Sequence, residues 1–242
     1  MDDNYWGAPG LGGPCSEIFV DRGPAYGAEG GPEADEDRHM EIWNHVFIQD
    51  EVDASGRIVA ELPAKNIDTG SGLERVACVL QDVANVFETD LMRPLLDVAE
   101  SLSGRTHGRD ERDDVSLKVI AEHGRATTFL IADGVQPSNE GRGYILRRML
   151  RRVVSHARRL GIEGEVMPPL VDRTVEIFGS AYPELVENRA YVEQVVSSEE
   201  SRFAGTLRQG MTLLEAEVEK AEGEKRLPGD VVFKLHDTFG FP

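Results

Sequence analysis

The chain has 242 residues, of which 40% are hydrophobic and 29% charged; these values are typical of a soluble globular protein with one large or two small domains and exclude a disordered chain. Its formal net charge of −18 argues against broad nonspecific binding to nucleic acid, and we expect no DNA partner. The chain has two cysteines, no apolar run of membrane-spanning length and no signal region at its N-terminus. We therefore expect a cytoplasmic protein that does not enter a membrane.

The first part of the chain predicts an antiparallel sheet. Residues 14–21 (PCSEIFVD) fit a short strand between loops, and residues 40–52 (MEIWNHVFIQDEV) are apolar and β-prone over the length of a strand. The turn signal ASGR at 54–57, followed by RIVAELP at 57–63, predicts a hairpin. A glycine-bearing turn at 66–72 should then open a helix, because apolar residues recur at helical spacing after it. These residues are Leu73, Val76, Ala77 and Leu80.

From about residue 90 onward, the apolar spacing predicts helices almost throughout. The expected helices include 116–134, 141–161, 168–179 and 184–222. Glycines close the first two, and Gly210 is a weak point within the last. A β piece followed by a helical piece predicts an α+β protein, with one domain at 1–88 and a helical domain at 89–242.

The segment IDTGSGLERV (67–76) has the composition of a ligand-binding turn. Gly70 and Gly72 allow the backbone to approach a ligand closely. Thr69 or Ser71 can cap the helix that follows. The segment therefore predicts a strand-to-helix turn whose helix N-terminus attracts anions.

Two charged residues extend this prediction. Arg75 lies on the first turns of the expected helix, where a cation is suited to phosphate, and Asp68 just before the turn could hold an ammonium group. The same residues also fit an ordinary capped turn with no ligand. No Walker A sequence is present, and GAPGLGG at 7–13 lacks the strand and helix that a dinucleotide fingerprint needs.

Alternation along residues 40–47 predicts two faces for that strand. Glu41, Trp43, His45 and Phe47 would share one face, and Ile42, Asn44 and Val46 the other. An asparagine flanked by apolar residues can bind a small polar ligand beside a small apolar pocket. A half-buried strand with a satisfied asparagine is the alternative.

The segment 137–161 (PSNEGRGYILRRMLRRVVSHARRLG) concentrates arginine in an acidic protein, with Glu140 as its one acid. Arginines four residues apart on a helix repel each other by about 0.2–0.5 kcal/mol per pair, so a partner outside the helix should offset the repulsion. That partner is either acids elsewhere in the chain or a phosphate backbone. The buried side should consist of Ile145, Leu146, Met149, Leu150, Val153 and Val154.

The remaining candidate residues carry little chemistry by themselves. None of the histidines lies at metal-ligand spacing with a cysteine, so we expect no metal site. Asp237, within HDTFGFP at 236–242, fits a plain turn residue.

Taken together, several stretches resemble in order the signature sequences of the alanyl-tRNA synthetase family. They are GPCSEIF (13–19), EIWNHVF (41–47), DTGSGLERV (68–76), LIADGVQPSNEGRGYILRRMLRR (130–152) and HDTFGFP (236–242). DTGSGLERV resembles motif 3 of class II aminoacyl-tRNA synthetases. The resemblance covers essentially the whole chain and implies the end of a class II antiparallel sheet followed by a helical tRNA-recognition domain.

The resemblance also implies an activity, alanine–tRNA ligase. In this reaction ATP, with Mg²⁺, activates L-alanine as alanyl-adenylate, and the alanyl group is then transferred to tRNA(Ala). Asp68 would bind the alanine ammonium group and Gly70 would keep the pocket open, in a pocket lined by Trp6, Asn44 and Val46. Asp68 and Arg75 would be the catalytic residues. ATP and magnesium would be held by Glu17, Glu41, Gly72 and Arg75.

The resemblance assigns the helical part to tRNA(Ala). Asn139 and Asp237 would read the G·U wobble pair of the acceptor stem. The arginine helix would follow the stem phosphates with Arg142, Arg147, Arg148, Arg151 and Arg152. An A-form helix exposes base edges and 2′-hydroxyls in its shallow minor groove, where short polar side chains reach them. The arginines would then be a local RNA footprint on an otherwise acidic protein.

The chain also departs from the family. Motifs 1 and 2 are not found, and the family's editing domain, which holds its zinc ligands, would follow the last residue. We therefore expect a piece of a longer protein that aminoacylates weakly by itself, since losing one oxyanion donor typically costs about 2.7–4 kcal/mol. A non-catalytic module that binds the acceptor stem is one alternative. An acidic helical protein with internally paired arginines is another.

Overall fold

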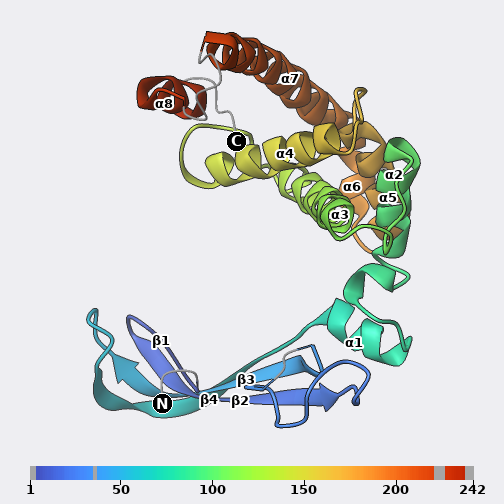
Figure 1. Cartoon of the computed structure of the whole chain (residues 1–242). Helices are drawn as coiled ribbons and strands as arrows, with labels where there is room; N and C mark the ends of the chain where they lie inside the picture. Colours follow the sequence, from blue (N-terminus) through green and yellow to red (C-terminus); the bar gives the residue numbers. More distant parts are fainter. Residues whose placement is uncertain (1–3, 35–36, 221–226, 238–242) are drawn as a thin grey trace. The chain divides into compact units, whose positions relative to one another are not determined.

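A computed structural model describes residues 4–34, 37–220 and 227–237, except for the side chains of Lys220, Lys234, His236 and Asp237. The chain divides into two compact units, unit 1 (Met1–Thr89) and unit 2 (Asp90–Pro242). Unit 1 carries an antiparallel sheet and unit 2 is helical, which confirms the predicted α+β class (Figure 1). The role assigned to each unit stays a prediction.

Within the described residues, the sheet of unit 1 has four strands in the order in which they occur along the chain, each antiparallel to the next. They are β1 (Tyr5–Ala8), β2 (Leu11–Asp21), β3 (His39–Val52) and β4 (Ile58–Ser71). The predicted turn at 54–57 joins β3 to β4. There the Asp53 carboxylate accepts hydrogen bonds from the backbone of Ser55 and Arg57, and Gly56 takes a φ of 82°.

The sheet begins earlier than the sequence predicted, because Gly12 and Gly13 let β2 lie against β3. A Cβ on Gly13 would come within 1.8 Å of the Phe47 carbonyl oxygen, and one on Gly12 within 2.6 Å of the Val52 side chain. These glycines were interpreted as loop residues. They instead permit a close approach of backbones.

The prediction of a turn at 66–72 was wrong, because residues 66–71 extend β4 and only Gly72 lies beyond the strand. They pair with β3 from Asn66 opposite Ile48 to Ser71 opposite Trp43. Small and glycine residues suggested a turn, but long-range pairing outweighs local propensity here.

The helix expected after this segment is present as α1 (Leu73–Leu80), followed by the short 3-10 helix η1 (Val86–Glu88). Neither Thr69 nor Ser71 caps it. Gly72 occupies the N-cap position without a side-chain hydrogen bond. The Thr69 and Ser71 hydroxyls instead donate to the carbonyls of Asn44 and Ile42 on β3.

Unit 2 is built from helices. They are α2 (Arg93–Ser103), α3 (Glu111–Ala132), α4 (Gly141–Arg159), α5 (Met167–Phe178), α6 (Pro183–Glu187), α7 (Arg189–Lys220) and α8 (Gly229–Asp237). α3 begins earlier than the predicted residue 116, since Asp110 caps it by accepting from the backbone of Arg112 and Asp113. The predicted helix at 184–222 is divided at Asn188 into α6 and α7, and α7 continues through Gly210.

The core of unit 2 forms around α3, which contacts α2, α4, α5, α6 and α7 (Figure 1). Gly124 permits the close packing of α3 on α5, because a Cβ there would lie 2.7 Å from Leu170. On α4 the buried side is narrower than predicted. Leu146, Leu150, Val153 and Val154 are buried, Met149 is half-buried, and Ile145 is exposed.

Candidate functional site

One face of the sheet in unit 1 brings together residues from three strands. Glu17 of β2 lies directly opposite Asn44 of β3, which lies opposite Gly70 of β4. Directly opposed residues of antiparallel strands point to the same face. The Asn44 side-chain amide donates to Glu17 Oε1 at 3.0 Å, so the asparagine is held in one orientation.

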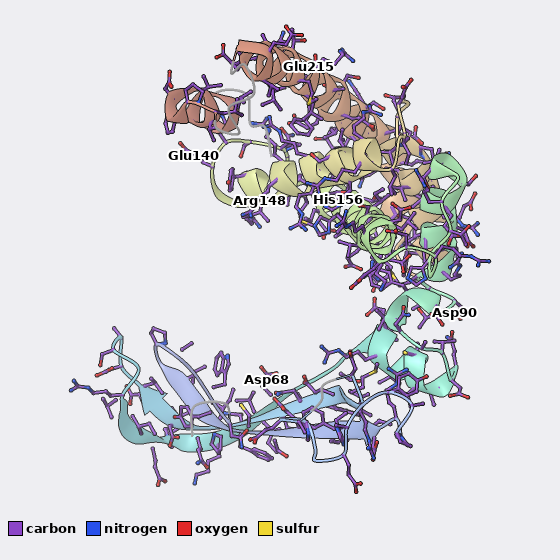
Figure 2. The ribbon with its side chains drawn as sticks, viewed as in Figure 1. Asp68, Asp90, Glu140, Arg148, His156 and Glu215 are labelled. Atoms are coloured by element: carbon purple, nitrogen blue, oxygen red, sulfur yellow. The ribbon has the colours of Figure 1, made fainter. Side chains whose placement is uncertain are left out.

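The next opposed set lies two residues along and therefore on the same face. Val46 of β3 is opposite Asp68 of β4 and Cys15 of β2. Asp68 is exposed, and a Cβ added to Gly70 would meet no atom within 4 Å. This face, which includes Asp68 (Figure 2), thus combines a carboxylate, an amide and a small apolar side chain beside open space.

Trp6 is not part of this opposed set. It lies on β1, which pairs only with β2, and its partner there is Gly13. Its side chain is 45% exposed. Its place in a pocket with Asn44 and Val46 stays a prediction.

The predicted faces of β3 are wrong at Glu41. A register shift between Ile18 and Phe19 places Phe19, rather than the next residue, opposite Glu41. Because Phe19 is two residues beyond Glu17, Glu41 falls on the face of Glu17 and Asn44 instead of that of Trp43. The stacked rings of Trp43 and His45, 5.8 Å apart, confirm that these two residues do share the other face.

A cavity of about 790 Å³ opens where this face meets α1. Its lining includes Glu17, Phe19, His39, Met40, Glu41 and Arg75. Arg75 Nη1 donates to Glu41 at both the carbonyl oxygen, 3.0 Å away, and Oε2, 3.1 Å away. The stem of Arg75 packs on Gly72, where a Cβ would lie 3.2 Å from it. The lining also includes Glu33 and Asp37, so four carboxylates and one guanidinium surround this polar cavity.

The sequence did not single out Phe19 or His39 as lining residues. Alternation along β2 could have indicated Phe19, since it follows Glu17 by two residues. His39, the first residue of β3, pairs with Asp21, the last residue of β2, and this pairing turns it toward the cavity. No local pattern marks it.

In unit 2, the five arginines between residues 142 and 152 of α4 divide into two groups. Arg147 and Arg151 point toward α7, where their Nε atoms lie 3.0 and 3.5 Å from Oε1 of the buried Glu199. Neither N–H is aligned with the oxygen as a hydrogen bond, so these contacts are ion pairs. Arg151 also lies over the ring of Phe203, 5.0 Å from its centroid.

The second group faces away from these partners. Arg142, Arg148 and Arg152 are exposed, and no acid among the described residues pairs with them. Arg148 projects from the side of α4 away from α7 (Figure 2). Internal pairing therefore accounts for Arg147 and Arg151, and for the three exposed arginines the phosphate partner stays a prediction.

Asn139 lies in the loop before α4 and is exposed. Its Oδ1 accepts a hydrogen bond from Arg147 Nη1, and Arg147 Nη2 donates to the Pro137 carbonyl at 3.3 Å. The loop folds back on the first turn of α4, since Ser138 N donates to Gly143 O at 3.1 Å. Asp237 is the last residue of α8, and its side chain and the residues after it lie outside the described part of the chain.

A buried histidine connects α4 to α3. His156 Nδ1 lies 3.0 Å from Ser116 Oγ (Figure 2 marks His156). Burial, together with the positive charges of Arg159 and Arg152, lowers the pKa of His156 to about 4. The imidazole is therefore neutral near neutral pH and serves as a packed hydrogen-bonding group.

None of the described helices combines the length and apolar character needed to cross a bilayer. Likewise, no cluster of three or more histidine, cysteine, aspartate or glutamate side chains in this part of the chain is arranged to hold a metal ion.

Comparison with known proteins relates these sites to one family. The model of the class II (A) tRNA synthetases matches residues 1–242. The alanine–tRNA ligases of Corynebacterium jeikeium (strain K411) and Frankia alni are 51% and 53% identical over 251 and 249 aligned residues. Each alignment covers 100% of this chain and 28% of the relative. The chain therefore spans little more than a quarter of the length of these relatives.

Proposed function

Because this chain belongs to the class II (A) tRNA synthetases, we propose that it supplies the alanine pocket, part of the ATP site and the acceptor-stem recognition surface of an alanine–tRNA ligase. The observation that carries the proposal is the shared face on which Asn44, Val46, Asp68 and Gly70 lie opposite one another. The free cysteines and the translation role fit the cytoplasm.

The shared face suits alanine. The Asp68 carboxylate would bind the ammonium group, and Val46 directly opposite would contact the methyl group. Gly70 leaves open the space in which the amino acid would lie. Trp6 would close the pocket from the β1 side.

The adjoining cavity suits ATP with its magnesium, which class II synthetases use in general. Mg²⁺ usually binds through one or two carboxylates together with substrate phosphates, and Glu17 and Glu41 provide such a pair. Asn44 donates to one oxygen of Glu17, and Arg75 donates to one oxygen of Glu41. The second oxygen of each carboxylate therefore remains for a ligand. Arg75 retains further N–H donors for phosphate beyond those bonded to Glu41.

In unit 2, Arg142, Arg148 and Arg152 would contact the phosphates of the acceptor stem of tRNA(Ala), and Asn139 and Asp237 would read base edges at the G·U pair. Phosphate contacts position a protein on its RNA, whereas edge contacts discriminate between sequences. A binding module without catalysis is the second candidate. It accounts for these arginines but gives no reason for the cavity around Glu41 and Arg75.

The test is binding of the 242-residue chain to an acceptor-stem hairpin carrying G·U or G·C, at two salt concentrations. Tighter binding of the G·U hairpin, weakened by salt, is the expected result. A parallel titration with a non-hydrolysable alanyl-adenylate analogue should show binding to unit 1. Equal and weak binding of both hairpins would reject the recognition role, and failure to bind the analogue would leave only the binding module.

A further inference from the structure

We propose that Arg147 is a positioning residue that fixes the side-chain amide of Asn139, so that its NH₂ group and not its oxygen faces the RNA. The inference rests on the proposed acceptor-stem role of Asn139. It separates Arg147 from the phosphate-contacting arginines of the same helix. It also makes Glu199, a residue of α7, part of the recognition apparatus.

The first step is that one guanidinium joins three segments. Nη1 of Arg147 donates to Asn139 Oδ1, Nη2 donates to the Pro137 carbonyl, and Nε lies 3.0 Å from Glu199 Oε1. The planar fork of arginine holds these nitrogens in fixed relation to one another. Anchoring on α7 therefore fixes the direction from which Asn139 is held.

The second step is the orientation of the amide. A guanidinium has only donors, so the atom of Asn139 that faces Arg147 must be its oxygen. The NH₂ group then occupies the other in-plane position on Cγ and is turned away from the Arg147 guanidinium. Asn139 is exposed, and acceptors are what this group would meet in the minor groove of an A-form stem, whether base-edge atoms or 2′-hydroxyl oxygens.

The third step is that Arg147 is committed to the protein. Its side chain is 20% exposed and that of Glu199 is 6% exposed. A buried carboxylate requires paired charge, because leaving it alone in a low-dielectric interior is costly. Drawing Arg147 out to a phosphate would leave Glu199 with Arg151 alone, 3.5 Å away. Within the described part of the chain, Arg148, the next residue, has no such partner.

The fourth step is that the loop has supports independent of Arg147. Gln136 Nε2 donates to Tyr191 Oη at 3.0 Å, and Ser138 N donates to Gly143 O at 3.1 Å. Replacing Arg147 should therefore release the amide of Asn139 while the loop backbone stays in place. This makes the proposal testable without unfolding the loop.

The first experiment uses the free 242-residue chain labelled with ¹⁵N. The two side-chain amide signals of Asn139 are assigned from their loss in Asn139→Asp, and their ¹⁵N relaxation is compared between variants. Arg147→Met should make this amide mobile on the picosecond–nanosecond timescale. Arg151→Met is the matched control, because it removes the other cation beside Glu199 but makes no contact with Asn139. Equal amide order in the wild type and Arg147→Met would overturn the proposal.

The second experiment uses the G·U and G·C hairpins. Arg147→Met should lower the G·U preference by about tenfold, as expected for one mispositioned hydrogen bond, and leave the salt dependence of binding unchanged. Asn139→Asp keeps an acceptor for Arg147 but lacks the NH₂ donor, so it should lose the preference too. A preference retained in Asn139→Asp would show that the oxygen reads the RNA and would refute the proposal.

These experiments separate two failures. If the wild-type chain does not distinguish the hairpins, the acceptor-stem role of Asn139 fails, whereas the relaxation measurement still decides whether Arg147 orients the amide. If Arg147→Met instead reduces the salt slope and keeps the preference, Arg147 contacts phosphate and the positioning role is rejected.

Discussion

Gly70 lies on the sheet face that carries Asp68, and it offers a direct test of the alanine pocket. Its φ is not positive, and a Cβ there meets nothing within 4 Å, so Gly70→Ala should fold normally and gain up to about 1 kcal/mol in unfolding free energy. The added methyl group would occupy the space proposed for the substrate. We expect binding of the alanyl-adenylate analogue to weaken by roughly tenfold or more.

Calorimetric titration and urea unfolding of the same preparation measure the two quantities. Gly164→Ala is the control, since it is the same change at another position where a Cβ meets open space. It should leave the affinity unchanged. Analogue binding that survives Gly70→Ala would place the pocket elsewhere.

His156 makes the stability of unit 2 sensitive to acid. Its pKa in the folded protein is about 4, below the ordinary value of 6.5. Between these two values the unfolded chain binds more protons than the folded one, so the unfolding free energy should fall as the pH is lowered through this window. Below about pH 4 both states are protonated at this residue, and its contribution to the slope ends.

The contribution of His156 can be isolated with His156→Asn, which retains a partner for Ser116 but carries no proton. Urea unfolding of both proteins at about pH 7 and about pH 5 should show a smaller loss of stability for the variant. If both proteins lose the same unfolding free energy between these two pH values, other groups, the carboxylates among them, account for the acid sensitivity.

At single residues, the sequence predicted side-chain positions that are determined by neighbours along the chain. It missed those that are determined by pairing with a distant strand or helix. Alternation placed Asn44 and Val46 on one face correctly. It misplaced Glu41, because the register shift opposite Phe19 arises from the pairing of two strands. The buried Glu199 beside Arg147 had no local signal either, because the partners are 52 positions apart.

Among the elements, the loop before α4 and the first turn of that helix form one folded piece. Gly143 is buried there, and a Cβ would lie 2.3 Å from both the Gln136 carbonyl oxygen and Ser138 Oγ. Gly143→Ala must therefore push the loop away from the helix. We expect a loss of about 1–3 kcal/mol in unfolding free energy and a reduced preference for the G·U hairpin, because Asn139 moves with the loop.

Gly205→Ala is a suitable comparison, since Gly205 also lies within a helix, α7, where an added Cβ meets no atom. There the change should stabilise the chain by up to about 1 kcal/mol through helix propensity. A Gly143→Ala variant as stable as the wild type would show that the loop yields without cost.

The helices of unit 2 were predictable because an apolar period persists over many residues, as it does through α3, α4 and α5. The strand β4 was not, because its second half, NIDTGS, has the residues of a turn and gains its structure only by pairing with β3. The same residues include Asp68 and Gly70. Sequence reasoning thus grouped these two candidate residues on one segment but assigned that segment the wrong backbone, and their role in binding stays a prediction.

On the scale of the whole molecule, charge is distributed unevenly. The chain carries −18 overall, yet Arg142, Arg148 and Arg152 are exposed along α4 without acidic partners among the described residues. Arg148 and Arg152 lie four residues apart, where like charges disfavour the helix slightly, and no acid among the described residues pairs with either of them. An RNA phosphate backbone would offset it, and the surrounding negative charge would repel RNA bound in any other position.

This distribution predicts how binding depends on salt. Each arginine that neutralises a phosphate should contribute about 0.9 to the slope of log affinity against log salt concentration, so Arg148→Met should reduce the slope by about that amount for both hairpins and preserve their ratio. Arg173→Met is the matched control, because Arg173 is paired with Glu176 on α5 and has no proposed RNA contact. If Arg148→Met leaves the slope unchanged, the exposed arginines are not the phosphate contacts. The reason why arginines cluster on α4 would then have to be their interactions within the protein.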